Sequence, residues 1–277
     1  MMFRLLLSAA ALALTVNAAQ AQALPERIKA AGKIVIAQTP NYPPLEYKDP
    51  QTNELTGFDI DLGNAIGKEL GVKIDWQEVS FEQMASALQT GRVDVIMSGM
   101  SDTPERQEIM DFADYLTSGA QFFIQNKREG EFKTLTDFCG KTIGASRRTS
   151  FPAEVAAWSE ENCVKAGKPA IKFIGTEGSA DARTQLRQAR IDAAVQGSET
   201  LPYIMKLEPD TYKVIGEPIT AQYQGIAFPK KETQLRDAVA GALKRLVADG
   251  TYTKIVEKYG MQSSAIKAIA VNGKPLN

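Results

Sequence analysis

Histidine is absent from the 277 residues of this sequence. Its absence removes the side chain that most often serves as a general base near neutral pH and as a metal ligand. Cysteine occurs only at Cys139 and Cys163, and two thiols are too few for a zinc site. We therefore expect no metal and no other cofactor. Lysines and arginines number 32 and acidic residues 33, so the balanced charge indicates no nucleic-acid partner.

Long apolar runs are also missing beyond the start of the chain. Residues 1–16 open with a positive charge and continue as an apolar stretch, and residues 19–21 end in small side chains. This pattern is typical of a secretory signal peptide. We predict a signal peptide over residues 1–21, cleaved before Gln22 or, alternatively, before Leu24. The apolar run is too short to span a membrane, and no cysteine lies near the cleavage site to carry a lipid. We expect a soluble, periplasmic protein.

The two cysteines have a leading interpretation in an exported protein. An oxidising compartment favours a local disulfide between Cys139 and Cys163. In the chain-entropy model, such a short loop would contribute roughly 3 kcal/mol to stability. The alternative is that both are free, buried thiols.

The order of the predicted elements indicates an α/β fold built from two similar units. In the first unit, apolar periodicity predicts strands at 33–38, 72–78 and 93–97 and helices at 59–70 and 81–89. The second unit has predicted strands at 141–145, 170–174 and 189–197 and helices at 151–165 and 180–187. Extended segments at 113–125 and 222–228 would cross between the units. Helices at 232–248 and 251–259 follow, and the small, polar tail at 262–277 is expected to be irregular.

A short sequence repeat relates the two units. GRVDVIMSG at 91–99 resembles ARIDAAVQG at 189–197. The arginine, aspartate and glycine at 92, 94 and 99 recur 98 positions later, as Arg190, Asp192 and Gly197. We interpret both segments as the same strand in two lobes. Because ligands of open α/β sheets bind at the carboxyl ends of the strands, this interpretation predicts a cleft between the lobes.

The loop after the first of these strands has the features of a carboxylate receptor. Gly99 lets a ligand approach the backbone closely, and Thr103 and Pro104 suit the N-cap and first position of a helix. Free backbone N–H groups followed by the guanidinium of Arg106 can bind a carboxylate. The alternative is an ordinary strand-to-helix connection with a surface arginine.

Five segments taken together resemble a known family: NYPPLEY, LTGFDIDLGNAIGKELG, LQTGRVDVIMSGMSDTPERQEIMDF, GKTIGASRRTS and LVADGTYTKIVEKYG. They resemble the solute-binding proteins of polar amino-acid ABC transporters, family 3 of the bacterial extracellular solute-binding proteins. The resemblance implies two lobes, each a mostly parallel sheet with helices on both faces, joined by two hinge strands. Lobe 1 would comprise residues 22–121 and 225–277, and lobe 2 residues 122–224. The implied partners are a small carboxylate-bearing solute and an ABC permease, for a protein expected to be a monomer.

The resemblance also implies roles for individual residues. Tyr42, next to Asn41, and Phe81 match aromatic positions that enclose the ligand side chain. The residues that match contacts to the ligand's α-carboxylate and ammonium lie in both lobes: Ser98, Gly99, Ser101 and Arg106 in the first, and Thr149 and Ser150 in the second.

Two departures from the family pattern fall in the second lobe. Where the family has an aspartate that holds the α-ammonium, this chain has Gly197, followed two residues later by Glu199. Where the family favours a glycine, it has Arg148, preceded by Arg147. Because a buried ammonium without a carboxylate is costly, the site would then prefer a more negative ligand or one with a masked amine. The alternative is that Glu199 replaces the aspartate while both arginines face solvent.

Two further functions remain open at this point. Some exported dehydratases that act on cyclohexadienyl acids resemble the same family, and Glu199 is the one obvious acid in the second lobe. With no histidine present, we expect no enzymatic activity. A protein of this kind could also present its ligand to a membrane sensor.

Overall fold

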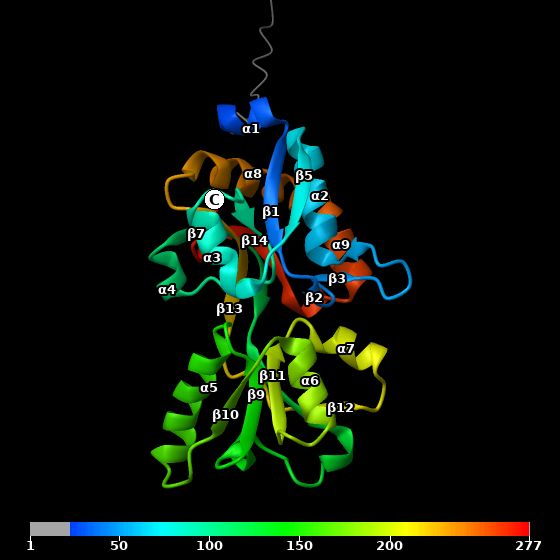
Figure 1. The fold of residues 1–277 in the computed structure, drawn as a ribbon, viewed down its shortest axis with the longest axis vertical. Coiled ribbons are helices and arrows are strands. Elements are labelled where there is room, and N and C mark those ends of the chain that lie inside the picture. Colours follow the sequence, from blue (N-terminus) through cyan, green and yellow to red (C-terminus); the bar gives the residue numbers. More distant parts are fainter. Residues whose placement is uncertain (1–22, 277) are drawn as a thin grey trace, which may run out of the picture.

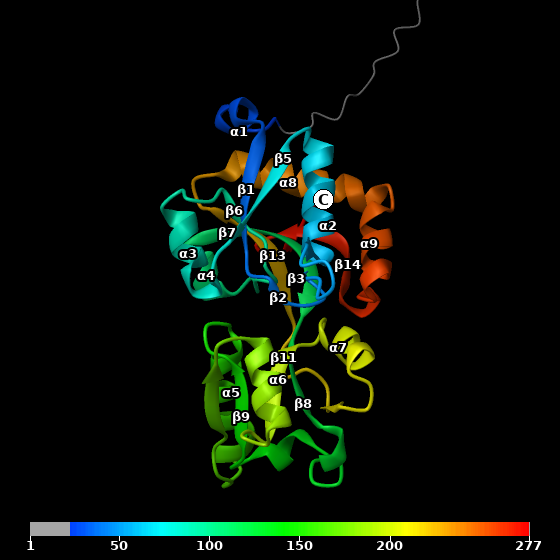
Figure 2. The same cartoon turned by 45° about the vertical axis from the view of Figure 1, so that its right-hand side comes forward.

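The computed structural model describes residues 23–276, and the predicted signal peptide over 1–21 lies outside them. Two lobes lie one above the other and are joined by two strand connections (Figures 1 and 2). No helix within the described range combines the length and the apolar character needed to cross a membrane. The α/β, two-lobed fold predicted from the sequence is confirmed, but both sheets are mixed rather than mostly parallel, because the strands next to the lobe crossings pair antiparallel.

Lobe 1 is organised around a seven-stranded sheet in the order β15-β14-β7-β13-β6-β1-β5. Strand β1, next to the edge strand β5, is parallel to β5 and β6, whereas β7, β13 and β14 pair antiparallel. The strands are β1 (Lys33–Gln38), β5 (Lys73–Glu78), β6 (Val95–Ile96), β7 (Met110–Ser118), β13 (Gln222–Pro229), β14 (Ala265–Val271) and β15 (Lys274–Pro275).

Helices cover both faces of this sheet, and a small three-stranded sheet lies at its cleft-facing end (Figure 2). Phe58, Leu62 and Ile66 form the buried stripe of α2 against α8 and α9, because they recur at helical spacing. The helices are α1 (Glu26–Ala31), α2 (Phe58–Leu70), α3 (Phe81–Gln89), α4 (Pro104–Gln107), α8 (Thr233–Ala248) and α9 (Thr251–Tyr259). The small sheet contains β2 (Asn41–Tyr42), β3 (Glu46–Lys48) and β4 (Leu55–Thr56).

Lobe 2 has a five-stranded sheet in the order β10-β9-β11-β8-β12. Strand β9 is parallel to both β10 and β11, while β8 pairs antiparallel with β11 and β12. The strands are β8 (Ala120–Gln125), β9 (Thr142–Ser146), β10 (Lys172–Thr176), β11 (Ala193–Gly197) and β12 (Tyr212–Ile215). The helices are α5 (Phe151–Ser159), extended by a π-helical turn (Glu160–Val164), α6 (Ser179–Arg187) and α7 (Leu201–Leu207).

The chain crosses between the lobes at two neighbouring places. It leaves lobe 1 at Gly119, between β7 and β8, and returns between β12 and β13. The two crossings approach so closely that a side chain at position 119 would overlap the carbonyl oxygen of Thr220.

The sequence repeat corresponds to one structural device used in each lobe. Asp94 exchanges two hydrogen bonds with Val35 of β1: its carboxylate accepts from the Val35 N–H at 2.8 Å, and its N–H donates to the Val35 carbonyl at 2.9 Å. Asp192 does the same with Thr142 of β9, at 2.9 and 2.8 Å. Each aspartate therefore fixes the register of its strand, beside β1 in lobe 1 and beside β9 in lobe 2.

The prediction for the C-terminal tail is wrong. Residues 265–271 form β14, which pairs with β7, and β15 pairs with β14 in turn. Ile269 and Ala270 are buried against lobe 1, and the side chain of Asn272 accepts a 2.7 Å hydrogen bond from the N–H of Phe112. A few apolar side chains were enough to place this segment on the sheet, although its composition is largely small and polar.

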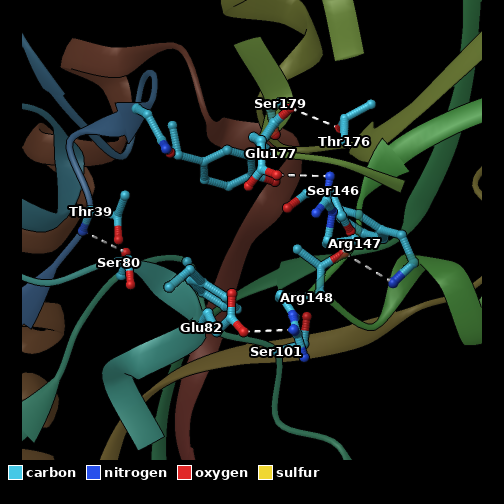
Figure 3. Close-up of a pocket in the computed structure, with 18 of the residues that line it drawn as sticks. Thr39, Ser80, Glu82, Ser101, Ser146, Arg147, Arg148, Thr176, Glu177 and Ser179 are labelled. Carbon is cyan, nitrogen blue, oxygen red and sulfur yellow. Dashed lines mark hydrogen bonds and ion pairs between the residues drawn. The ribbon is translucent and has the colours of Figure 1, made fainter. Parts of the chain in front are cut away.

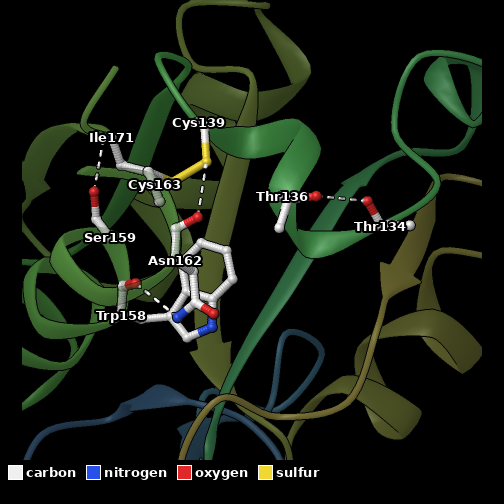
Figure 4. The surroundings of a disulfide bond; sticks show 8 residues. All are labelled: Thr134, Thr136, Cys139, Trp158, Ser159, Asn162, Cys163 and Ile171. Atoms are coloured by element: carbon white, nitrogen blue, oxygen red, sulfur yellow. Dashed lines mark hydrogen bonds between the residues drawn. A yellow bond between two sulfur atoms is a disulfide. The ribbon is translucent and has the colours of Figure 1, made fainter. Parts of the chain in front are cut away.

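The predicted disulfide is confirmed. Cys139 and Cys163 are bonded, with their Cα atoms 5.5 Å apart. The bond ties the segment before β9 to the π-helical turn after α5, where Asn162 and Trp158 lie beside it (Figure 4). The disulfide is therefore a covalent cross-link within lobe 2.

Candidate ligand-binding site

A pocket lies between the two lobes, in the position predicted from the strand ends. The empty space between its lining residues is about 840 Å³, part of it open to solvent. Lobe 1 contributes Thr39, Asn41, Tyr42, Glu46, Ser80, Phe81, Glu82, Ser98, Gly99, Ser101 and Arg106. Lobe 2 contributes Ser146, Arg147, Arg148, Thr149, Phe151, Thr176, Glu177, Gly178 and Ser179.

Most of the residues expected at the ligand line this pocket, and three do not. Those that line it are Asn41, Tyr42, Phe81, Ser98, Gly99, Ser101, Arg106, Arg148 and Thr149. Ser150, Gly197 and Glu199 are outside the lining. Ser150 instead accepts a hydrogen bond from Gln222 at the hinge, at 3.3 Å.

Several lining residues were not predicted. Ser146 ends β9 and Thr176 ends β10, and Glu177, Gly178 and Ser179 follow directly. Their place at the carboxyl ends of parallel strands is the signal that could have found them. No such signal marks Glu46 and Glu82 in the sequence, because the tertiary packing of β3 and α3 brings these side chains to the pocket.

Arg106 is held in place without a carboxylate partner among residues 23–276. Its backbone N–H donates to the hydroxyl of Thr103 at 3.4 Å, which is the predicted N-cap, and its Nη1 donates to the carbonyl of Ser101 at 2.9 Å. The guanidinium lies over the ring of Phe81, 5.7 Å from its centroid. Burial lowers the pKa of Arg106, and the nearby charge of Glu154 opposes this shift. A half-buried cation with unused donors is therefore available to an anion.

Two ion pairs lie among the residues that line the pocket (Figure 3). Arg148 of lobe 2 reaches Glu82 of lobe 1 at 2.6 Å, so this pair spans the cleft. Arg147 pairs with Glu177 at 2.8 Å within lobe 2. The Arg148 and Glu82 side chains are 57% and 55% exposed, which is why this pair can open as the lobes separate.

Glu199 forms a buried junction between the lobes and the hinge. It is 1% exposed, and its carboxylate accepts hydrogen bonds from the hydroxyls of Tyr42 (2.9 Å) and Ser118 and from the Gln224 amide (2.9 Å). Burial raises the pKa of Glu199, and these hydrogen bonds oppose the shift. A Cβ at Gly197 would fall against this carboxylate and 2.5 Å from the Tyr42 hydroxyl. Glu199 thus occupies the space of an aspartate side chain at 197.

Two further carboxyl groups, Glu46 and Asp59, are buried near each other, and Glu46 lines the pocket. Glu46 accepts a 2.6 Å hydrogen bond from Ser98, and Asp59 accepts from Tyr115 at 2.9 Å and from the N–H of Gly99 at 3.1 Å. Burial raises the pKa of Asp59 to about 7. Burial, followed by the charge of Asp59, raises the pKa of Glu46 well above its usual value. Glu46 lines the pocket, and its Oε2 is buried without a hydrogen-bond partner among the residues that the structure describes.

The comparison with family models decides the identity of the chain. Residues 34–262 match the model of the bacterial extracellular solute-binding proteins, family 3. The chain belongs to this family. The match extends from β1 to the start of the C-terminal segment and so includes both lobes and the pocket.

Curated relatives of this solute-binding protein are amino-acid-binding proteins. It is 28% identical over 254 residues to the arginine-binding protein ArgT of Corynebacterium glutamicum, covering 92% of this chain and 83% of that protein. It is also 28% identical to the L-cystine-binding protein TcyA of Bacillus subtilis, covering 84% of this chain and 82% of that protein.

Solved structures agree with this assignment. An ancestral arginine-binding protein bound to arginine is 31% identical, with a TM-score of 0.73 over 82% of this chain and 98% of that one. An ancestral amino acid-binding protein described as a precursor of cyclohexadienyl dehydratase is also 31% identical, with a TM-score of 0.73 over 84% of this chain and 97% of that one.

Proposed function

We propose that this chain is the periplasmic solute-binding protein of an ABC importer. It captures an amino acid or a related small carboxylate in the interlobe pocket and delivers it to the permease. The proposal includes export through the signal peptide over residues 1–21 and action as a monomer. Lobe 1 comprises residues 22–121 and 225–277, and lobe 2 comprises residues 122–224.

The state of Arg106 is the observation that supports this proposal most directly. Its guanidinium faces the pocket beside Gly99 and Ser101 and has no ion-pair partner among residues 23–276. A planar guanidinium binds a carboxylate through two parallel hydrogen bonds, and such bonds are strong where water is scarce. The ring of Tyr42 and the ring of Phe81 supply apolar walls for the rest of the ligand.

The contacts between the lobes support a mechanism of capture by closure. Tyr42 bonds Glu199, Glu82 pairs with Arg148, and the hydroxyls of Tyr47 and Tyr203 lie 2.9 Å apart. Each contact joins one lobe to the other, so all are lost when the lobes swing apart at the hinge. A ligand that bridges Arg106 and the lobe 2 wall shifts the equilibrium toward this closed form, which is the form a permease recognises.

Isothermal titration calorimetry of the mature protein tests the proposal. The titrants are amino acids, opines and dicarboxylates, and native mass spectrometry of the freshly purified protein identifies any ligand that it retains. Saturable binding of a small carboxylate at a 1:1 ratio supports the function. Failure to bind any of them, with no retained ligand, overturns it.

One observation favours a second candidate, an exported dehydratase. The carboxyl group of Glu46 lines the pocket, and burial raises its pKa well above its usual value, which suits a group that donates a proton to a departing hydroxyl. Glu199, the acid predicted for this role, is outside the lining. Incubating the protein with prephenate or arogenate and measuring the aromatic product separates the two functions, because a binding protein forms none.

A further inference from the structure

We propose that Gln222 is a positioning residue for the carboxylate receptor: its side-chain amide holds Glu154 at the hinge and thereby keeps Arg106 free for the ligand. Gln222 lies outside the pocket lining, so it acts through its neighbours. The inference rests on the proposed function, because it concerns the arginine that receives the carboxylate of the ligand.

The side chain of Gln222 lies where both lobes meet the hinge. Gln222 is the first residue of β13, and it is paired with Ser118 at the end of β7. Its Nε2 donates to the hydroxyl of Ser101 in lobe 1 at 3.2 Å and to Oε1 of Glu154 in α5 of lobe 2 at 2.9 Å. The hydroxyl of Ser150 is a third acceptor, at 3.3 Å. One amide therefore connects a pocket wall in lobe 1 with the start of α5 in lobe 2.

Glu154 is an acid that could compete with a ligand for Arg106. Nη1 of Arg106 donates to the carbonyl of Ser101 at 2.9 Å, and the hydroxyl of the same serine accepts from Gln222, which also bonds Glu154. Only two residues therefore separate the guanidinium from this carboxylate along a chain of hydrogen bonds. Of the charges that raise the pKa of Arg106, that of Glu154 has the largest effect. A carboxylate this close can itself bind a guanidinium.

Two hydrogen bonds from the returning lobe crossing hold Glu154 away from Arg106. Oε1 of Glu154 accepts from Gln222 at 2.9 Å, and Oε2 accepts from the hydroxyl of Thr220 at 2.5 Å. Glu154 is outside the pocket lining. Without the Gln222 amide, Oε1 of this half-buried carboxylate would lose its donor, and a carboxylate oxygen without a donor is costly. The unused N–H groups of Arg106 would then take the place of the amide and be lost to the ligand.

A purely structural role of Gln222 makes a different prediction. If the amide only stabilises the closed hinge, its loss weakens ligand binding whatever residue stands at position 154. If the amide keeps Glu154 away from Arg106, its loss weakens binding only while position 154 carries a negative charge. The two roles therefore differ in whether a neutral residue at 154 restores affinity.

Calorimetry on three variants separates these roles. Gln222→Met keeps the length of the side chain and removes its donors, and it should weaken binding about tenfold, as expected for one hydrogen bond to a charged group. Glu154→Gln removes the competing charge and should bind at least as tightly as the natural protein. The double variant Gln222→Met, Glu154→Gln should recover the natural affinity to within about twofold.

The titrant is whichever of L-glutamine, L-glutamate and L-arginine binds the natural protein most tightly, or the ligand that the purified protein retains. Gln185→Met is the matched control. Gln185 donates to the carboxylate of Asp181 at 3.2 Å in lobe 2, and neither residue lines the pocket, so affinity should not change. Urea denaturation checks that each variant is folded.

The outcomes for the inference and for the proposed function are distinct. Unchanged affinity in Gln222→Met overturns the inference and leaves the proposed function standing. A double variant that binds as weakly as Gln222→Met does the same, because the amide would then act on the hinge alone. If the natural protein binds no small carboxylate and retains no ligand, the proposed function itself is overturned.

Discussion

The hydroxyl of Tyr42 donates a 2.9 Å hydrogen bond to the carboxylate of Glu199, across the gap between the lobes. The same carboxylate is bonded to Ser118 on one hinge crossing and Gln224 on the other. A single buried acid therefore joins a pocket wall in lobe 1, the end of β11 in lobe 2 and both hinge strands. Its hydrogen bonds to Tyr42 can form only when the lobes are closed.

Tyr42→Phe should weaken the closed form while leaving the ring in the pocket wall. The variant removes one donor from a buried carboxylate, and such bonds to charged groups contribute roughly 1.5–3 kcal/mol. We expect a matching loss of ligand affinity by calorimetry and a larger radius of gyration by X-ray scattering with ligand present. Tyr47→Phe removes a neutral interlobe bond to Tyr203 and should cost less. If Tyr42→Phe and Tyr47→Phe lower ligand affinity equally, the special role of Glu199 is contradicted.

Arg106→Ala should abolish most of the carboxylate affinity. Truncating one partner of a desolvated charge pair typically costs roughly 2–5 kcal/mol. Arg106→Lys should recover only part of it, because an ammonium provides neither the planar fork nor the stacking on Phe81. Calorimetry measures the loss, and Arg187→Ala serves as the control. If Arg106→Ala leaves the affinity nearly unchanged, the carboxylate of the ligand binds elsewhere.

Gly197→Asp should destabilise the protein. From the sequence alone, an aspartate there would restore the family's ammonium partner and raise affinity for α-amino acids. In the structure its Cβ would fall against the Glu199 carboxylate and 2.5 Å from the Tyr42 hydroxyl, and two carboxylates would share one site. Overpacking typically costs about 1–3 kcal/mol, measurable by urea denaturation.

The double variant Gly197→Asp with Glu199→Ala makes the room that the single variant lacks. We expect it to recover stability and to bind neutral α-amino acids more tightly than the natural protein. If the double variant loses more stability than the two single variants lose together, the two positions do not compete for the same space.

Stability should fall as the pH rises from about 5 to 8. Burial and the charge of Asp102 raise the pKa of Asp114 to about 8, from 3.8 for an ordinary aspartate. Between these values the folded state binds a proton that the unfolded state has lost, so the contribution is full at low pH and is lost as the pH passes about 8. Asp59, with a pKa of about 7, acts in the same direction.

Asp114→Asn should reduce this slope, since an amide can donate to Asp102 without holding a titrating proton. Urea denaturation at pH 5 and pH 8 measures the change. Asp249→Asn is the control: hydrogen bonds from Thr251 lower the pKa of this aspartate, so it is ionised in both states throughout the window. An unchanged slope for Asp114→Asn would show that the pair does not titrate there.

Replacing both cysteines should weaken lobe 2 without affecting the ligand. Cys139 and Cys163 are separated by 24 positions, and closing such a loop contributes about 3 kcal/mol in the chain-entropy model. We expect a Cys139→Ser, Cys163→Ser variant to unfold at lower urea and to retain its ligand affinity when folded, because neither cysteine lines the pocket. A large loss of affinity would show that the disulfide also affects the ligand-binding site.

The sequence by itself determined the local features of the site. Thr103 caps the helix that carries Arg106, the predicted 33–38 strand matches β1, and the repeated aspartates fix equivalent strands in both lobes. These features depend on neighbouring residues in the chain or on the order of the strands. Apolar periodicity and helix-capping residues therefore reveal them in the sequence. The tail was misjudged because a few apolar side chains outweighed its composition.

Only the tertiary structure determines which charged side chains contact which partners. Glu199 lies 157 positions from Tyr42, and nothing in either segment indicates that they bond. The same holds for Arg148 and Glu82, which come from different lobes. These pairs exist because docking two lobes across a hinge places their surfaces together, and they determine which charges the pocket leaves for a ligand. The sequence predicted a carboxylate receptor at Arg106, and the structure places this guanidinium over the ring of Phe81 with no ion-pair partner among residues 23–276.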